Sequence, residues 1–217
     1  MRRRDKLRPD PEVRREILQA ASIALREHGV RGLGITAVLE RAGLSTRAFY
    51  RHFASKDELI AAVFLENARV EKRRLRRRMS RATTDIEAVA AWIDGRLDLA
   101  FDETIGADLR RLSMEAQSQL FASPIIVQPA YAEILEPLSD TLRRGLANGM
   151  FHHIDPVTDA QFIHGVVWAG IDRQWATGDC DRDDLRRHSV RFCLGGLGVT
   201  PEAIERVCPQ TYGEGGC

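Results

Sequence analysis

The sequence predicts an all-α protein in which an N-terminal three-helix helix-turn-helix domain precedes a helical C-terminal domain, with about nine to ten helices in total. Apolar residues recur at spacings of three and four along most of the chain, and strand-like alternation never extends past a few residues. Charge is divided as well: residues 1–80 hold 20 Lys and Arg against 10 Asp and Glu, and residues 81–217 hold 12 against 21. A basic end on an acidic remainder indicates that one end meets a polyanion.

Residues 1–11 predict a flexible basic arm, because the segment is too charged and too often interrupted by proline to pack. Its cations suit contact with phosphates or entry into a minor groove, and a merely solubilising tail is the alternative. A helix with one apolar stripe is expected from Glu12 to His28, and Gly29 ends it. This helix should pack across the two that follow as the third wall of the N-terminal core.

The next stretch has the pattern of two short helices joined by a turn. Gly43 follows the apolar stripe of the first helix, at a point where a left-handed residue is needed. Ser45 or Thr46 can cap the second helix, which spans about two turns and buries Phe49 and Phe53 on one face. Its other face projects hydrogen-bond donors, namely Thr46, Arg47, Tyr50, Arg51 and His52. Such a pair is a helix-turn-helix, whose second helix enters a major groove.

Helical patterns continue through the rest of the chain. Ser55 is placed to cap a long linking helix over residues 56–80. Further helices are expected over residues 85–101, 106–121, 125–148, 158–177 and 181–194, and a short one begins at Thr200-Pro201. Helices of this number can enclose a small molecule within their core. Candidates for lining such a pocket, with plain core packing as the alternative, are Trp92, Arg96, Phe101, Met114, Gln117, Phe121, Tyr131 and Trp168.

Three groups of residues resemble the tetracycline-repressor (TetR/AcrR) family of bacterial transcription regulators: Gly43-Leu44-Ser45, Phe49-Tyr50-Arg51-His52-Phe53 and Ser55-Lys56-Asp57-Glu58-Leu59. The similar part runs from about Arg15 to Phe64, and beyond it only length and helical pattern agree with the family. The resemblance implies phosphate contacts from Tyr50, His52 and Lys56, the last at a helix N-terminus that attracts anions. For His52, a ring stacked on Tyr50 or Phe53 is the alternative.

Two positions depart from the family pattern. Gly34 stands where a Ser or Thr commonly caps the first helix of the pair and touches phosphate, and we expect Thr36 to substitute for it. Arg47 stands where a small residue is usual, and its guanidinium can pair with guanine O6 and N7. We therefore expect Arg47 to read a base, with a phosphate or solvent contact as the alternative. The predicted DNA-contact set is Thr36, Ser45, Thr46, Arg47, Tyr50, Arg51, His52 and Lys56.

The linking helix carries eight basic residues between Arg69 and Arg81. At 1.5 Å per residue, Arg69 lies about 20 Å and Arg78 about 33 Å along the helix from Lys56. These distances are several times the Debye length of roughly 8 Å, beyond which salt screens a charge, if the helix leaves DNA as it does in the family. These residues are therefore not expected to contact DNA. The next helix carries an acidic stripe at i, i+4 and i+8, formed by Asp94, Asp98 and Asp102. We expect the basic run to face this stripe or solvent, with an anionic ligand or partner as the alternative.

The resemblance also implies the domain organisation. It gives a basic arm at residues 1–11, a helix-turn-helix domain at 12–55, a linking helix at 56–80, a ligand-binding and dimerisation domain at 81–208 and a flexible tail at 209–217. In the family, the last two long helices pair with their copies around a two-fold axis. The residues expected at this dimer interface are Phe162, Val166, Gly170, Val190 and Leu194.

Other functional classes find little support. No run of 18 apolar residues and no apolar signal segment occurs, so a cytoplasmic protein without membrane contact is expected. The four cysteines have spacings of 13, 15 and 9, which indicate neither a zinc site nor a redox pair, so no metal or cofactor is expected. No Ser-His-Asp order or phosphate-binding glycine loop predicts an enzyme.

The sequence thus predicts a homodimeric, sequence-specific DNA-binding transcriptional regulator. We expect a repressor that an unidentified small-molecule effector releases from a near-palindromic DNA operator, by shifting the spacing of the two helix-turn-helix motifs. A transcriptional activator of the same architecture is the main alternative. An enzyme that uses the helical pocket, and a helix-turn-helix that binds protein instead of DNA, are the others.

Overall fold

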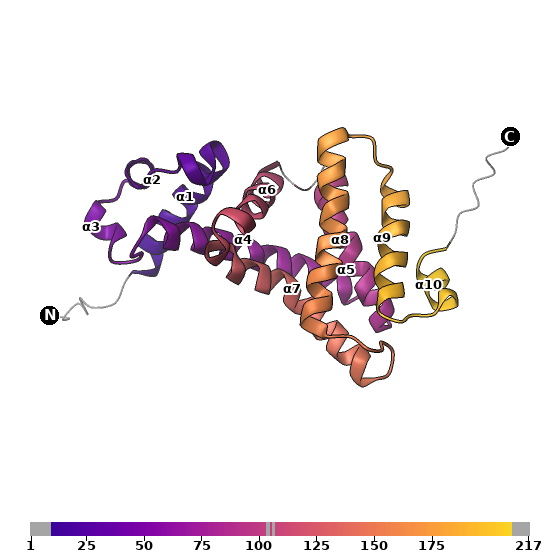
Figure 1. Cartoon of the computed structure of the whole chain (residues 1–217). Helices are drawn as coiled ribbons and strands as arrows, with labels where there is room; N and C mark the ends of the chain where they lie inside the picture. Colours follow the sequence, from indigo (N-terminus) through magenta and orange to yellow (C-terminus); the bar gives the residue numbers. More distant parts are fainter. Residues whose placement is uncertain (1–9, 103–104, 106, 210–217) are drawn as a thin grey trace. The chain divides into compact units, whose positions relative to one another are not determined.

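The computed structural model describes residues 10–102, 105 and 107–209, whose helices are labelled α1 to α10 in Figure 1. Their bounds are α1 Pro11–Gly32, α2 Ile35–Ala42, α3 Thr46–Phe49, α4 Lys56–Met79, α5 Asp85–Phe101, α6 Ala107–Ala122, α7 Pro124–Ala147, α8 Pro156–Thr177, α9 Arg182–Gly196 and α10 Pro201–Val207. The described residues contain no strand, and the all-α prediction is confirmed. Most of the expected basic arm and all but the first residue of the expected tail lie outside the described residues.

The described chain forms two compact units. The N-terminal unit comprises residues 10–69 and 107–131, and the C-terminal unit comprises residues 70–102, 105 and 132–209. Helices α4 and α7 therefore each contribute residues to both units. Helix α6 belongs with α1 to α3, although the sequence places it among the helices of the expected ligand-binding domain.

The N-terminal unit begins with α1, whose first turn is fixed by Asp10 and Pro11. The Asp10 carboxylate accepts a hydrogen bond from the amide of Glu12 at 2.9 Å, which is a standard N-terminal cap. The last two residues of the expected arm thus start the helix. Gly29 breaks α1 with a φ of 66° and a ψ of −179°, so the regular helix ends at His28 as predicted. One more turn follows before α2.

Helices α2 and α3 form the predicted helix-turn-helix. Gly43 ends α2 in the left-handed conformation, with a φ of 66° and a ψ of 30°, where a residue with a Cβ atom is disfavoured. Val38 and Leu39 of α2 are buried and help to form the core against α1. Helix α3 is shorter than predicted, with one regular turn that continues irregularly to Phe53.

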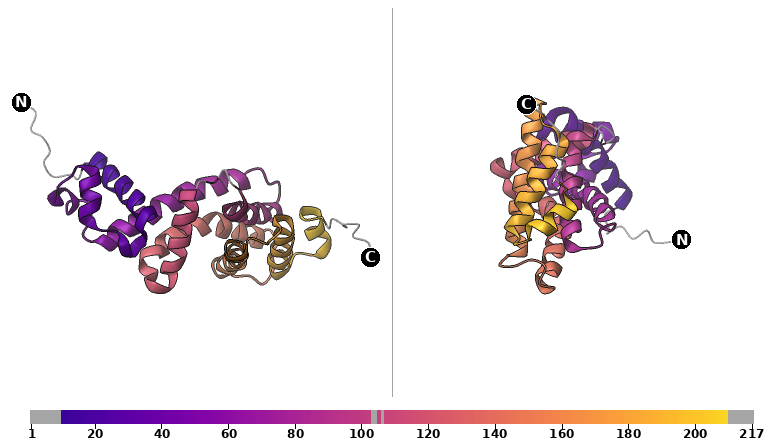
Figure 2. Two further views of the ribbon diagram at one scale, coloured as in Figure 1. Left: turned by 90° about the horizontal axis from the view of Figure 1, so that it is seen from above. Right: turned by 90° about the vertical axis from the view of Figure 1, so that its right-hand side faces the viewer.

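The C-terminal unit is built around α5. This helix packs against α8, α9 and α10, and its twelve buried residues include Trp92, Ile93 and Leu97. Helices α8 and α9 run side by side, as the orange and yellow ribbons of Figure 2 show. Gly170 of α8 permits their close approach, because a Cβ atom there would lie 2.6 Å from a methyl carbon of Leu185. Among the described residues, no helix is long and apolar enough to cross a membrane.

Carboxylates neutralise much of the basic run on α4. Asp98 is buried and accepts hydrogen bonds from Arg74 at 3.3 Å, Arg78 at 2.7 Å and Arg182 at 2.8 Å. The predicted meeting of the run with the acidic stripe is therefore confirmed at Asp98. It is wrong for Asp94, which pairs with Arg186 of α9 at 2.6 Å because α9 packs against that part of α5.

The remaining cations of the run divide into two groups, apart from Arg69, which pairs with Glu66 on the same helix at 2.7 Å. Lys72 pairs with Glu133 and Glu136 of α7, and Arg76 also reaches Glu136, at 3.0 Å. Three exposed residues, at i, i+4 and i+8, have no ion pair within the described chain: Arg73, Arg77 and Arg81. Ion pairing thus accounts for one side of the helix and leaves a narrow basic stripe in solvent.

Candidate nucleic-acid interface

Helix α3 is held in place by its apolar side. Phe49 and Phe53 are almost completely buried, with ring centroids 5.8 Å apart. The guanidinium of Arg14 on α1 lies 5.1 Å from the centre of the Phe53 ring, within the range of a cation–π contact. Ser45 caps the helix through its hydroxyl, which accepts from the amide of Ala48 at 3.3 Å. These contacts fix the position of the opposite face.

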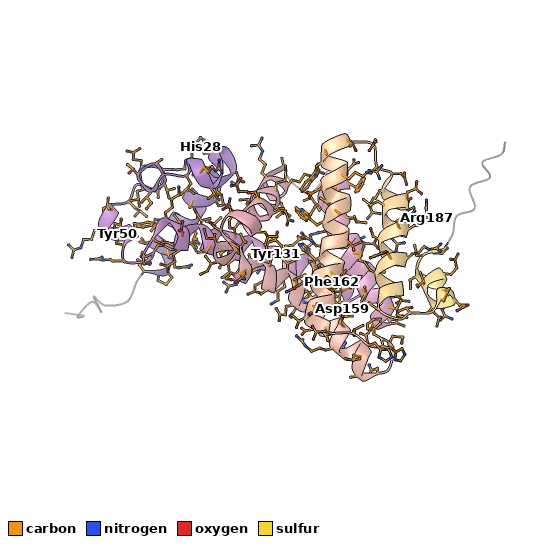
Figure 3. All side chains as sticks on the ribbon, viewed as in Figure 1. His28, Tyr50, Tyr131, Asp159, Phe162 and Arg187 are labelled. Atoms are coloured by element: carbon orange, nitrogen blue, oxygen red, sulfur yellow. The ribbon has the colours of Figure 1, made fainter. Side chains whose placement is uncertain are left out.

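That opposite face carries the donors that the sequence predicts. Thr46, Arg47 and Arg51 are exposed, and the Tyr50 side chain is 62% exposed and projects from the end of α3 (Figure 3). Neither Arg47 nor Arg51 has a carboxylate partner within the described chain. A short helix with two unpaired guanidinium groups, a phenol and hydroxyls has the chemistry needed for phosphates and base edges.

Lys56 and His52 lie where the chain passes from α3 to α4, and both are partly buried. Lys56 is the first residue of α4, where free amides already attract an anion. Ser55 accepts from the amide of Glu58 at 3.1 Å, and the Glu58 carboxylate accepts in turn from the Ala54 amide. This reciprocal cap fixes the beginning of α4 and therefore the position of Lys56.

Thr36 does not replace the missing cap of α2. Gly34 occupies the capping position, and no side chain donates or accepts a capping hydrogen bond there. Thr36 is instead exposed, two residues inside the helix, where its hydroxyl does not reach the first free amides. The structure thus corrects the capping role that was expected of Thr36 and leaves its hydroxyl available to solvent.

Comparison with known proteins agrees with this geometry. Residues 17–63 match the family described as bacterial regulatory proteins, tetR family, and this range covers α2, α3 and the residues that cap α4. Residues 17–63 of the chain thus carry the DNA-binding domain of the TetR family. Together with the similarity described below, this match supports a DNA-binding transcription regulator of a ligand-responsive class. The resemblance predicted from the sequence motifs is confirmed.

Similarity to individual TetR-family regulators extends over most of the chain. The HTH-type transcriptional activator FasR of Mycolicibacterium smegmatis is 26% identical over 207 residues, covering 92% of this chain and 89% of that protein. The regulator FadR of Bacillus subtilis, in complex with stearoyl-CoA, has a TM-score of 0.65 and 19% identity over 84% of this chain and 98% of its own. SmeT, the repressor of the Stenotrophomonas maltophilia multidrug efflux pump SmeDEF, has a TM-score of 0.60 and 24% identity, covering 84% and 89%.

Part of the predicted pocket set meets in the core of the C-terminal unit. Arg96 and Glu71 are each 3% exposed and form an ion pair of 2.9 Å. Burial opposes ionisation of Glu71, but hydrogen bonds and charges from Arg74 and Arg96 outweigh it and lower the Glu71 pKa. The Arg96 guanidinium lies 5.8 Å from the centre of the Trp168 ring.

His164, which is not among the predicted pocket residues, joins this cluster. Its ring lies between Trp92 and Trp168, at centroid distances of 6.2 and 5.9 Å. Burial, assisted by the charge of Arg96, lowers the His164 pKa to about 3, so the ring is neutral at physiological pH. Only its position on α8, one turn before Trp168, could have indicated a pocket residue, and that spacing is equally typical of residues that pack in a core.

The other predicted pocket residues do not join this cluster. Gln117 and Tyr131 belong to the N-terminal unit, where the Tyr131 hydroxyl donates to the Gln117 side chain. Met114 also belongs to that unit and is mostly exposed, while Phe101 of the C-terminal unit is partly buried. The side chain of Phe121 lies outside the described part of the structure.

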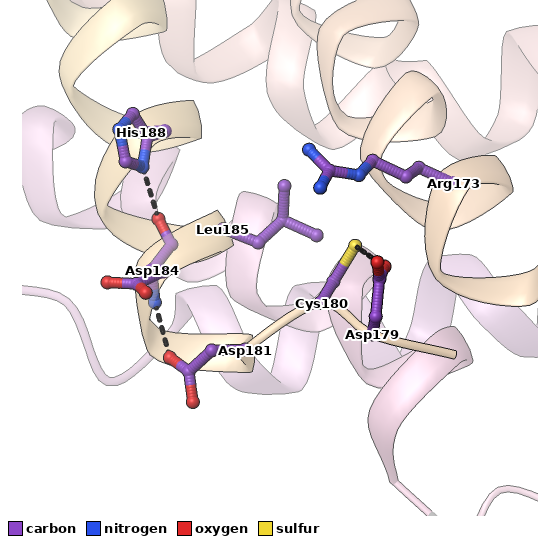
Figure 4. Close-up of a pocket in the computed structure, with 7 residues that line it drawn as sticks. All are labelled: Arg173, Asp179, Cys180, Asp181, Asp184, Leu185 and His188. Atoms are coloured by element: carbon purple, nitrogen blue, oxygen red, sulfur yellow. Dashed lines mark hydrogen bonds between the residues drawn. The ribbon is translucent and has the colours of Figure 1, made fainter. Parts of the chain in front are cut away.

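A separate cavity of about 420 Å³ lies at the turn between α8 and α9, away from the predicted pocket residues (Figure 4). Arg173, Leu185 and His188 line it together with Cys180 and three aspartates. The aspartates make local hydrogen bonds; for example, the Asp181 carboxylate accepts from the amide of Asp184 and caps α9. Within the described chain, no group of three His, Cys, Asp or Glu side chains is arranged to hold a metal ion.

The paired helices α8 and α9 carry an exposed apolar face. Phe162 of α8 is 66% exposed and Phe192 of α9 is 70% exposed (Figure 3 labels Phe162). Gly170, Val190 and Leu194 are instead buried within the single chain, where they pack α8 and α9 on the core. These three predicted interface residues therefore contribute little exposed apolar surface, whereas Phe192, which was not predicted, contributes much of it. Val166 is partly buried.

Proposed function

We propose that the protein is a homodimeric repressor that binds a near-palindromic operator through α3 and leaves it when a small molecule binds the C-terminal helical domain. The observation that carries the proposal is the exposed face of α3, where Arg47 and Arg51 stand without carboxylate partners in the described chain. Two copies of this face, related by a two-fold axis, would occupy successive major grooves.

The side chains of this face take different roles in the proposal. Arg47 pairs with a guanine edge and discriminates among bases, which is worth about 1–3 kcal/mol against a wrong base. Tyr50, His52 and Lys56 contact phosphates and hold the helix in register. The remaining members of the proposed interface supply further donors to the DNA backbone, and they are Thr36, Ser45, Thr46 and Arg51.

Dimerisation is proposed to bury the apolar face of α8 and α9 around Phe162 and Phe192. Exposed aromatic rings on two packed helices are typical of a protein contact. Gly165, Gly195 and Gly196 favour the same surface, because a Cβ atom built on each would meet nothing within 4 Å. A second copy of the chain can therefore approach these helices closely.

The effector is proposed to bind beside the cluster of Trp92, His164 and Trp168 in the C-terminal unit. Aromatic rings next to a buried guanidinium, here that of Arg96, suit a ligand with an apolar body and an anionic group. FadR of Bacillus subtilis, which shares this fold, binds stearoyl-CoA, a ligand with both properties. Long-chain acyl-CoA molecules are therefore the first effector class to test.

Activation of transcription is the second candidate function. FasR, which is similar over 92% of this chain, is described as a transcriptional activator, whereas SmeT is a repressor. A reporter gene placed behind the bound DNA distinguishes the two, because deletion of the regulator raises expression in one case and lowers it in the other.

The decisive experiment begins by selecting duplexes from a random-sequence library with the purified protein. Fluorescence anisotropy on the best duplex, at about 50 and about 200 mM salt, should show affinity that falls by about a thousandfold, as expected for a phosphate binder. Two chains should bind each duplex, and stearoyl-CoA should release them. Failure to enrich any sequence, or an affinity that does not depend on salt, contradicts the proposal.

A further inference from the structure

The connection between α1 and α2 is unusual in its backbone. Gly29 has a φ of 66° and a ψ of −179°, a combination that is essentially restricted to glycine. Gly32 and Gly34 follow within five residues, so half of residues 29–34 are glycine. Such a segment has more conformational freedom than any other in the helix-turn-helix, and ordering it carries a larger entropic penalty. Of its side chains, only that of Leu33 is buried.

A side chain distant in sequence holds this connection. The carboxylate of Glu115, on α6, accepts a hydrogen bond from the amide of Val30 at 2.9 Å. The extended ψ of Gly29 turns this amide out of the direction of the helix axis, where a carboxylate can reach it. A Cβ atom at Gly29 would lie 3.2 Å from the second Glu115 oxygen, so the carboxylate rests directly against the break. Helices α1 and α6 pack together within the N-terminal unit.

The bond lies where it can influence the position of the helix-turn-helix. Residues 30–34 lead directly into α2, which leads through Gly43 into α3. A side-chain hydrogen bond also joins α1 to α2 directly, from Arg41 to Glu27 at 2.7 Å, but both side chains are at least one-third exposed and the bond contributes little. The bond from Glu115 is partly buried and carries a full charge on the acceptor, which makes it stronger than a neutral bond.

Helix α6 also presents a second side to the molecule. Gln117, two residues after Glu115, lies on the opposite side of the helix, since two residues correspond to about 200° of rotation. There Gln117 accepts from the Tyr131 hydroxyl of α7. The same helix therefore contacts α7 on one side and the break in α1 on the other.

We propose that Glu115 is a positioning residue for DNA binding, because its carboxylate fixes the Gly-rich connection at Val30 and thereby the placement of α2 and α3 against α1. The inference rests on the proposed function, since the helix-turn-helix must read DNA for its placement to matter. Glu115 does not touch DNA in this scheme. A displacement of α6 breaks the bond and frees the connection.

The test compares the full-length wild type with E115A, E115Q and the matched control S118A, an exposed position on the same helix. Hydrogen exchange measures protection of the Val30 amide, and anisotropy measures affinity for a duplex that the wild type has selected from a random library. For E115A we expect exchange at Val30 to accelerate and affinity to fall, each by about tenfold, with melting temperature little changed. E115Q retains an acceptor oxygen and should recover most of both, and S118A should match the wild type.

Several results overturn the inference. Wild-type affinity in E115A would show that the bond does not place the reading helix, and unchanged exchange at Val30 would show that the bond does not form. If E115A loosens the whole N-terminal unit, the E115Q variant provides the test. Loss of DNA affinity in E115Q while the Val30 amide stays protected overturns the role of Glu115. Retention of both the affinity and the protection supports it. A wild type that selects no duplex refutes the proposed function, and this outcome is distinct from equal binding by wild type and E115A.

Discussion

Helix α3 and the second half of α4 are both rich in arginine, but their arginines have different surroundings. Arg47 and Arg51 project from α3 without carboxylate partners in the described chain. Arg74 and Arg78 of α4 instead converge on the buried Asp98. The comparison teaches that a basic run identifies a nucleic-acid surface only where its charges remain unpaired after folding. The sequence shows more positive charge on the second half of α4 than on α3, and ion pairing neutralises much of it, whereas the two arginines at α3 keep their full charge in solvent.

The largest expected effect comes from removing the centre of the paired region. Asp98→Ala leaves Arg74, Arg78 and Arg182 without their common buried partner and removes three charged hydrogen bonds, so the free energy of unfolding should fall by about 2–3 kcal/mol. Chemical denaturation measures this change. Glu66→Ala, which removes the exposed partner of Arg69 on the same helix α4, should change stability by less than about 1 kcal/mol. Equal effects of the two changes would contradict the assignment of Asp98 as the centre.

The second prediction separates unpaired charge that reads DNA from unpaired charge that does not. Arg47→Ala should weaken binding to the selected duplex by about 1–3 kcal/mol and relax preference at one base pair. Arg73→Ala removes another exposed arginine, one without an ion pair in the described part of α4, and affinity should stay within about 0.5 kcal/mol. Anisotropy on a panel of duplexes, each with one base pair changed, measures both. Full discrimination by Arg47→Ala at every position would refute its role as the base reader.

The third prediction concerns pH, through the neutral ring beside Arg96. The folded protein keeps His164 neutral down to a pH of about 3, whereas in the unfolded chain the ring takes up a proton below about 6.5. Stability therefore falls as pH falls from 6.5 towards 3, by about 2 kcal/mol at pH 5. His164→Gln should lack this dependence in denaturation curves at pH 7 and pH 5. A variant that loses as much stability as the wild type would place the titrating group elsewhere.

The smallest effect is expected at the exposed phenol of α3. Tyr50→Phe removes one hydroxyl and leaves the ring contact with Phe49, whose centroid is 5.2 Å away. Binding should weaken by about 0.5–1.5 kcal/mol, alike for every duplex, because a phosphate contact carries no base preference. A loss confined to one operator sequence would show that the hydroxyl contacts a base instead.

Local features of the fold were predictable from the sequence, but the pairing of side chains between different helices was not. Gly43, the Ser45 cap and the apolar stripes act within a few residues, so helix ends were placed to within about two residues for most elements. The pairing of Asp94 with Arg186 depends on which helix packs on α5. Val190 is buried within the single chain, and helical spacing alone does not distinguish a core position from an interface position. The Glu115 bond joins residues 85 positions apart, and no spacing rule indicates it.

The enclosure of α5 has a consequence for the kinetics of the C-terminal unit. Twelve of its residues are buried, and α8, α9 and α10 pack against it, so solvent reaches its central amides only when the neighbouring helices separate. Deuterium uptake at Ile93 or Leu97 should therefore be the slowest in the chain and should report the complete opening of this unit under native conditions. A molecule that binds and stabilises the surrounding helices should therefore slow deuterium uptake at these amides of α5.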